Sequence, residues 1–126
     1  MAKEVRRESA GRFLEKARQF YESALEDYQK GRYDACIFQA SQAVILANDA
    51  LCIAALGQRA SMDHREAARL HLKACKNRES KKDLVVEALD KRNEFGYTEK
   101  ESGAQEANLL LVRAKRFLDW VRERVA

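Results

Sequence analysis

The sequence predicts an all-α protein, a single-domain antiparallel bundle of about five helices. The 126 residues contain no proline and only 5 glycines, so few positions interrupt a helix. Apolar residues recur at three- and four-residue steps in five segments, which is the period of a helix with one buried face. The connectors between these segments are short, and the chain length suits one domain.

The N-terminal part of the chain predicts a charged tail followed by a first helix. Residues 1–8 are mostly charged and are expected to be frayed, so the bundle domain is expected to span residues 9–126. Ser9 can cap the helix, and Gly31 is expected to end it, because glycine is favoured after a helix. The apolar face of this helix consists of Phe13, Ala17, Phe20, Ala24 and Tyr28.

The segment from Arg32 to Leu56 is predicted to be the central helix of the bundle. It lies between Gly31 and Gly57 and is apolar around most of its circumference, so several neighbouring helices must cover it. The few polar positions on its remaining narrow side are Gln39, Gln42 and Asp49. A stripe at seven-residue spacing is more than a hairpin with the first helix requires, which suggests a homodimer. That stripe consists of Phe38, Ile45 and Cys52.

Three further helices are expected in the rest of the chain. A short third helix over about 64–76 would follow a capping box formed by Asp63 and Glu66. The fourth helix would follow a loop at 77–82, with Ser80 or Asp83 as its cap, and Gly96 is expected to end it. The last helix has the most regular period, with Ala107, Leu110, Leu111, Ala114, Phe117, Leu118, Val121 and Val125 on one face.

Charge, cysteine content and hydropathy limit the cellular setting. The net charge of +4 at pH 7 is mild and both signs are interspersed, which fits solvated helix faces or a surface that attracts RNA or nucleotides. Cys36 and Cys52 lie about four turns apart on one helix, too far for a disulfide. With no run of about eighteen apolar residues and no signal peptide, we expect a cytoplasmic protein without a membrane span.

Arg92 is the most unusual residue of the fourth helix. It lies seven positions after Val85 and three after Leu89, so helical geometry points it inward near the end of the helix. An inward guanidinium needs a partner or an opening. It could bond helix-end carbonyls or an acid, or it could face a cleft that binds phosphate or RNA. Asn93 and Tyr97 follow within the next turn and loop and join Arg92 as candidate ligand-binding residues.

The order of these features resembles the HEPN family, the higher-eukaryote and prokaryote nucleotide-binding domains. The resemblance covers Phe13 to Val125 and depends on spacing, on the segment Tyr33-Asp34-Ala35 before an alanine-rich helix, and on Arg92-Asn93 and Tyr97. It implies a helical bundle, a two-fold dimer whose cleft contains the arginine, and in many members a nucleotidyltransferase partner.

The resemblance also implies a test for catalysis. In family members that are ribonucleases, four to six residues separate the arginine from a histidine, but Tyr97, Thr98 and Glu99 occupy those histidine positions here. Tyrosine, with an unperturbed pKa of about 10, exchanges protons poorly near neutral pH. We therefore expect a non-catalytic accessory module without a cofactor, which binds a nucleotide, RNA or a protein partner near Arg92. A metal-independent, toxin-like ribonuclease that uses Arg92, Asn93 and Tyr97 is the alternative.

Two other patterns, one of a repeat unit and one of metal ligands, give weaker indications of function. The segment from Ala24 to Val44 resembles a tetratricopeptide unit, which leaves a protein-interaction domain as a further alternative, but no second copy follows about 34 residues later. His64, His71 and Cys75 lie on one side of the third helix, where histidine and cysteine one turn apart can bind zinc. No second pair of ligands is evident, so no metal site is expected.

Overall fold

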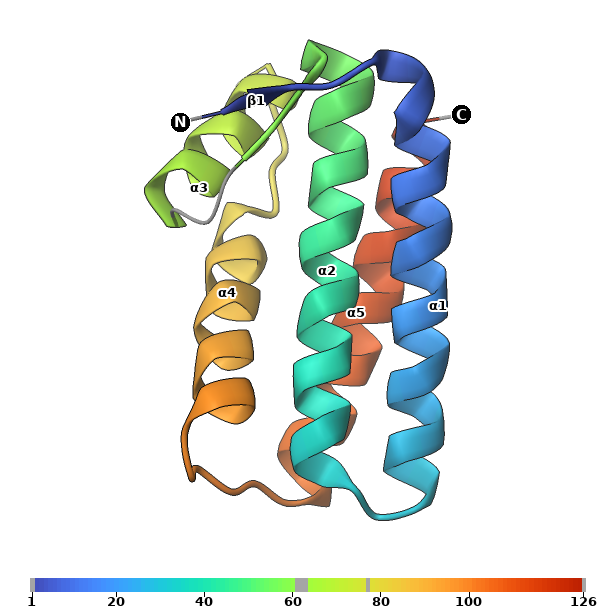
Figure 1. The fold of residues 1–126 in the computed structure, drawn as a ribbon, viewed down its shortest axis with the longest axis vertical. Coiled ribbons are helices and arrows are strands. Elements are labelled where there is room, and N and C mark those ends of the chain that lie inside the picture. The colour runs from blue at the N-terminus through green and yellow to red at the C-terminus, as the bar shows by residue number, and fades with distance from the viewer. Residues whose placement is uncertain (1, 61–63, 77, 126) are drawn as a thin grey trace.

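The computed structural model describes residues 2–60, 64–76 and 78–125, which form five α-helices and a two-stranded sheet. The helices are α1 (Ala10–Gln29), α2 (Tyr33–Leu56), α3 (His64–Ala74), α4 (Lys82–Tyr97) and α5 (Ala104–Val125). The strands are β1 (Lys3–Glu4) and β2 (Gln58–Arg59), and a 3-10 turn over Arg7–Ser9 precedes α1. Figure 1 shows α1, α2 and α5 running side by side. On the other side of α2 lies α4, and α3 lies above α4 in this view. The predicted all-α bundle is confirmed.

The central position of α2 is also confirmed, because α1, α3, α4 and α5 all pack against it. Its side chains Ile37, Val44 and Ile53 are fully buried. The helix is apolar enough to span a membrane by length and composition, with a mean hydropathy of 1.4 over its best window, which the simple count of apolar residues had not indicated. In the bundle 72% of that window is buried, as in the core helix of a folded domain.

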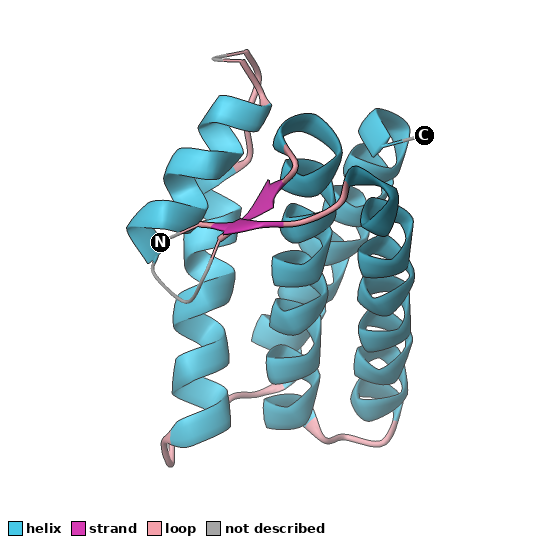
Figure 2. Cartoon of the chain, turned by 45° about the horizontal axis from the view of Figure 1, so that its top comes forward, coloured by secondary structure: helices cyan, strands magenta, loops and turns pink. Residues whose placement is uncertain are grey.

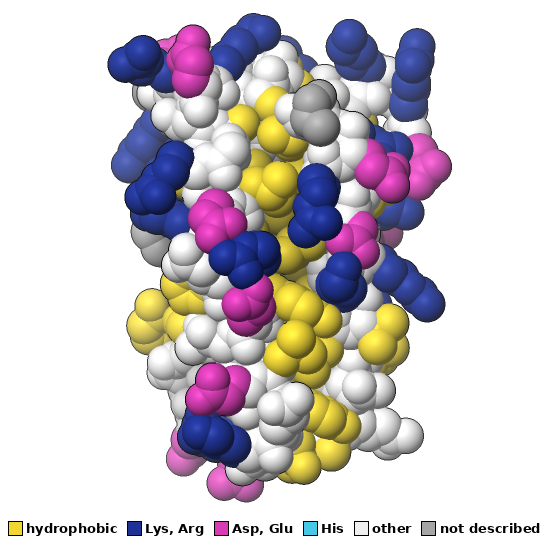
Figure 3. All heavy atoms as spheres, turned by 90° about the vertical axis from the view of Figure 1, so that its right-hand side faces the viewer, with side chains coloured by type: hydrophobic (Ala, Val, Ile, Leu, Met, Phe, Trp, Pro, Cys, Tyr) yellow, Lys and Arg dark blue, Asp and Glu magenta, His cyan; other side chains and the backbone are white. Residues whose placement is uncertain are grey.

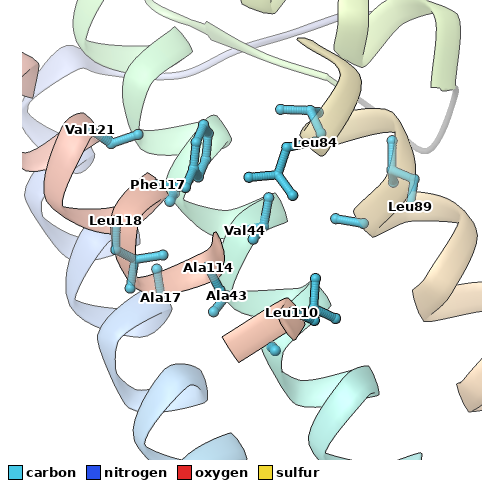
Figure 4. Close-up of a cluster of buried hydrophobic side chains, with 14 of the residues drawn as sticks. Ala17, Ala43, Val44, Leu84, Leu89, Leu110, Ala114, Phe117, Leu118 and Val121 are labelled. Atoms are coloured by element: carbon cyan, nitrogen blue, oxygen red, sulfur yellow. The ribbon is translucent and has the colours of Figure 1, made fainter. Parts of the chain in front are cut away.

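Small side chains let the long helices approach closely. Ala17 and Ala24 of α1, Ala43 of α2 and Ala114 of α5 have no exposed surface. Figure 4 shows alanines of α1, α2 and α5 among larger side chains from α2, α4 and α5. The segment from Ala24 to Val44 is thus one hairpin of a closed bundle, whereas a tetratricopeptide scaffold stacks several hairpins in a row.

Part of the apolar stripe that suggested a homodimer packs against α4 within the same chain, at Phe38 and Ile45. Cys52 is buried, and Phe38 and Ile45 are half-buried. A Cβ atom added to Gly96 would lie only 2.5 Å from the Phe38 ring, so the glycine allows the ring to pack against the α4 backbone. Gly96 therefore does not end α4 as expected, since the helix continues to Tyr97. Packing within one chain therefore accounts for part of the stripe, and Phe38 and Ile45 remain partly exposed.

The N-terminal segment, which the sequence predicts to be frayed, contains the strand β1 and a 3-10 turn in the structure. β1 runs antiparallel to β2, with Lys3 opposite Arg59 and Glu4 opposite Gln58 (Figure 2). Gly57 ends α2 in the left-handed conformation, with φ of 67°, and its carbonyl accepts a hydrogen bond of 2.9 Å from the backbone of Val5. The turn after α2 thus offers backbone groups that the N-terminal segment satisfies.

The predicted helix caps are less accurate than the helices. Ser9 is at the N-cap of α1, but its side chain makes no capping hydrogen bond. Lys81, and not Ser80 or Asp83, is at the N-cap of α4. The predicted cap at Asp63 lies outside the described residues. A cap depends on the exact entry angle of the chain, which sequence spacing alone does not determine.

Acidic and basic side chains alternate on the side of the bundle where α1 lies. Figure 3 shows this face, with charged groups of both signs around a central apolar band. Arg18 of α1 contacts the carboxylates of Glu15 and Glu22, and Lys115 of α5 bonds Asp119 at 2.8 Å. Because charges of both signs occur there and Arg18 and Lys115 are paired with acids, this face does not form a field of one sign.

Candidate functional site

Arg92 lines a pocket of about 220 Å³ between α2, α4 and the small sheet. Lys3 of β1, Arg59 of β2 and Asp49 of α2 are its other charged residues. Apolar side chains complete the walls, among them Ile45 and Leu89. The inward direction that helical phase predicted for Arg92 is therefore observed, and three cations surround one carboxylate.

Each cation comes from a different element. Arg92 lies one turn after the buried Ala88 of α4, so the apolar packing of that helix directs it toward α2. The β1–β2 pairing places Lys3 and Arg59 opposite each other at the rim. The Arg59 guanidinium also lies over the Phe13 ring of α1, 5.0 Å from its centroid. The small sheet thus brings two cations to the end of the Arg92 pocket.

Two guanidinium donors in this pocket are unsatisfied. Nε of Arg92 and Nε of Arg59 are buried and have no hydrogen-bond partner within the described part of the chain. Arg59 Nε is 3.8 Å from Oδ2 of Asp49, which is within ion-pair range but too long for a hydrogen bond. Buried donors without acceptors are uncommon in folded proteins, and a guanidinium fork matches an anion such as phosphate.

Asp49 is the group in this pocket whose protonation is most affected by the fold. Asp49 belongs to the most apolar helix, and the residue is only 6% exposed. Burial raises the pKa of Asp49 to about 7, against the opposing effect of the positive charges of Arg59 and Arg92. A carboxyl group with a pKa of about 7 can hold or release a proton at neutral pH.

Of the three candidate residues from the sequence, Arg92 alone lines the pocket. Asn93 is exposed. Tyr97 is 76% exposed, and its ring packs edge-on against Phe38 with the centroids 6.5 Å apart. Successive helical residues point about 100° apart, so neighbours of an inward arginine face outward. Asn93 and Tyr97 therefore lie on the surface of the same helix.

Sequence reasoning missed the other charged residues of the pocket. Asp49 carried a signal, because a carboxylate within a helix buried on nearly all sides has to find a partner. The sequence pattern instead places it on the narrow polar side of that helix. Lys3 and Arg59 carried no such signal, because their position depends on a pairing between two-residue strands more than fifty residues apart in the chain.

His71 of α3 is fully buried and links three helices. Its Nδ1 donates a hydrogen bond of 2.7 Å to Oδ1 of Asn48, and its Nε2 accepts one of 2.8 Å from the backbone N–H of Lys81. Burial lowers the pKa of His71 to about 4. The side chain thus anchors α3 to α2 and to the start of α4, as a neutral imidazole with both nitrogens engaged.

The histidines and cysteines do not assemble a metal centre in the described residues. Sγ of Cys75 lies 3.6 Å from Nε2 of His71, but that nitrogen already accepts the hydrogen bond from Lys81. The side chain of His64 lies outside the described part. The three cysteines are free thiols, and burial raises the pKa of Cys36 to about 11 and that of Cys52 to about 12.

Comparison with known proteins identifies the family of this bundle. The HEPN domain matches residues 10–124, a range that begins with α1 and extends almost to the end of α5. No curated protein matches the chain. The match covers the pocket arginine Arg92, together with Asp49 and Arg59, while Lys3 lies before it. Because the matched range covers most of the chain and all five described helices, this chain belongs to the HEPN domain family.

Proposed function

We propose that this protein is a non-catalytic HEPN binding module that holds a phosphate group of RNA or of a nucleotide in the Arg92 pocket. The observation that carries the proposal is the Nε of Arg92, which is buried without a hydrogen-bond partner among the described residues, in a pocket that also contains Arg59 and Lys3. Buried donors that lack acceptors are satisfied when an anion enters. The mild positive charge of the chain favours the same class of ligand.

The dimensions of the pocket suit one phosphate group. Its volume of about 220 Å³ is below the roughly 300–1,000 Å³ of pockets that enclose whole small molecules. The remainder of the ligand would therefore lie outside, along the exposed side of α4. There Asn93 and Tyr97 are available for a hydrogen bond and for stacking on a base.

We propose that the protein binds without cleaving RNA. Tyr97 stands where a proton-transferring histidine would be expected, and it is exposed and outside the pocket. Family membership supports further proposals, because HEPN domains are often dimeric or paired with nucleotidyltransferases. We propose a cytoplasmic homodimer or such a pair, with the Arg92 pocket near the shared cleft. Light scattering of the purified protein, alone and with a candidate nucleotidyltransferase, tests the assembly.

RNA binding tests the proposal directly. Fluorescence anisotropy of a labelled single-stranded oligonucleotide should show about tenfold weaker binding for Arg92→Ala, with a shallower dependence on salt. Arg122→Ala is the matched control, because Arg122 is an exposed cation of α5 that does not line the pocket. Equal losses in the two variants would indicate attraction by general charge and would contradict a site at Arg92.

The second candidate function is a metal-independent ribonuclease, and Asp49 is the observation that favours it. A buried carboxyl group with a pKa of about 7 lies in the same pocket as Arg92 and could exchange protons in place of the missing histidine. Labelled RNA should then be cleaved in the presence of a chelator. Cleavage that is lost in both Asp49→Asn and Arg92→Ala would establish the enzyme and overturn the accessory module.

A further inference from the structure

We propose that the protein has a second anion site, at the N-terminus of α4 where it packs against α5, which binds a small phosphate-bearing anion such as a phosphomonoester or a diphosphate. An open pocket of about 520 Å³ lies there, and its volume is in the range of small-molecule sites. It shares no lining residue with the Arg92 pocket, so the inference does not depend on the function proposed above.

Positive charge converges on this pocket from two helices. Lys81 and Lys82 contribute from the start of α4, and Arg113 and Arg116 contribute from successive turns of α5. Asp83 is the acid among the described lining residues. The cations thus exceed the acids in the wall, which favours an anionic ligand.

The cations are only partly neutralised by neighbouring acids. Arg113 pairs with Glu87 at 2.5 Å, and Lys81 pairs with Glu79 at 3.2 Å at the surface. Arg116 is exposed and forms no ion pair with any described residue. Surface pairs contribute little free energy, so an anion that contacts several of these side chains can compete with them.

The start of α4 adds donors to the same pocket. Lys81 is at the N-cap, and its side chain makes no capping hydrogen bond to this 16-residue helix. The first backbone N–H groups of a helix lack intrahelical acceptors and carry a partial positive charge, which suits phosphate oxygens. The backbone N–H of Lys81 is itself bonded to the buried His71, so the helix start is held in place before any ligand arrives.

The apolar wall indicates which part of a ligand this pocket recognises. Phe117 and Trp120 of α5 line it and stack on each other, with centroids 5.7 Å apart. The Trp120 ring also stacks with His71, and the Arg124 guanidinium lies 3.9 Å from its centroid. Because the Trp120 ring already packs against Phe117, His71 and Arg124, it serves as a wall of the pocket and not as a platform on which a base could stack. The ligand class is therefore defined by its phosphate.

The single tryptophan of the chain provides a local reporter for this site. Titration with inorganic pyrophosphate, at ionic strength held constant with sodium chloride, should change Trp120 fluorescence saturably. Arg116→Glu should weaken the apparent affinity by about tenfold or more, because it removes a cation and adds an acid. Arg122→Glu makes the same charge change on α5 outside the pocket and should leave the affinity within about twofold.

Three results would overturn the inference. The first is the absence of a saturable response at millimolar pyrophosphate. The second is an equal loss of affinity in Arg116→Glu and Arg122→Glu, which would mean general surface charge. The third is an RNA oligonucleotide that binds more tightly than pyrophosphate and depends on Arg116, which would assign the pocket to a polymer. Circular dichroism checks the fold of each variant, and Arg116→Gln replaces Arg116→Glu if the charge reversal unfolds the protein.

Discussion

The two sides of α2 are packed by different means. On one side lie α1 and α5, of 20 and 22 residues, which contact α2 through fully buried alanines. On the other side lie α3 and α4, of 11 and 16 residues, which are tied to α2 partly by polar links such as the hydrogen bond between His71 and Asn48. The long-helix side packs continuously, whereas the short-helix side contains helix ends and buried polar groups.

This contrast in packing indicates which side of the domain can bind a ligand. Continuous apolar packing leaves no donors or acceptors to offer a ligand. The ends of short helices leave backbone groups and inward charged side chains, which water or a ligand must satisfy. Both proposed anion sites border α4, one at Arg92 near its end and one at Lys82 at its start.

The largest effect is expected in the apolar core. Val44 is fully buried at the centre of α2, so Val44→Asp would bury an unpaired carboxylate and should unfold the domain, at a cost of more than about 4 kcal/mol. Leu109→Asp is the matched control, because Leu109 is 58% exposed. Far-ultraviolet circular dichroism and thermal melts compare them. A Val44→Asp variant with wild-type thermal stability would contradict the central placement of α2.

The short-helix side should be the part that acid weakens, through His71. The unfolded histidine binds a proton near pH 6.5, whereas the folded one does so only at about pH 4. Between these pH values the unfolded chain binds more protons than the folded chain. His71 therefore makes its full contribution to stability above pH 6.5, and about 2–3 kcal/mol of that contribution is lost as the pH falls to 4.

Chemical denaturation from pH 4 to 7, compared with His71→Gln, isolates this contribution. The carboxyl groups, including Asp49 with its opposite dependence, are common to both proteins and cancel in the difference. Burial raises the pKa of Asp49, so its own contribution decreases as the pH rises from about 4 to about 7. If the free energy of unfolding changed with pH in the same way for the two proteins, the lowered pKa of His71 in the folded state would be contradicted.

Gly96 tests how closely α4 approaches α2. A Cβ at this position would lie 2.5 Å from the Phe38 ring, so Gly96→Ala should cost about 1–3 kcal/mol through overpacking. Gly11→Ala is the control, because Gly11 is also helical but a Cβ there meets nothing within 4 Å. That variant should gain up to about 1 kcal/mol from helix propensity. If denaturant titrations showed the same sign of stability change for Gly96→Ala and Gly11→Ala, the close contact between α4 and Phe38 would be contradicted.

The smallest stability effect is expected for Arg92→Ala. The Nε of Arg92 has no hydrogen-bond partner in the described residues, so its removal breaks no such bond there, and the change should stay below about 1 kcal/mol. Denaturant titration at several pH values on both sides of the raised Asp49 pKa of about 7 is suitable, because it compares the neutral and the charged carboxyl group. A loss of several kcal/mol would instead make Arg92 a structural partner of Asp49 and would weaken the binding proposal.

Local patterns accounted for the helices but not for the sites. The apolar period placed α2 and α5 within a few residues, and the positive φ of Gly31 and Gly57 agrees with the two predicted turns. The role predicted for Gly96 was wrong, because the sequence does not reveal whether a glycine ends a helix or makes room for an aromatic ring. Arg92 was found through its helical phase, while its companions Lys3 and Arg59 were not.

The sequence by itself determined the all-α class, the central helix and the inward direction of Arg92, because each follows from spacing along one segment. Tertiary structure decided which charges meet Arg92, that α4 covers Phe38, and that His71 holds the start of α4. These depend on contacts between residues far apart in the chain, such as Asn48 with His71 and Lys3 with Arg59. No local period encodes them, because each requires the other helices to be in place first.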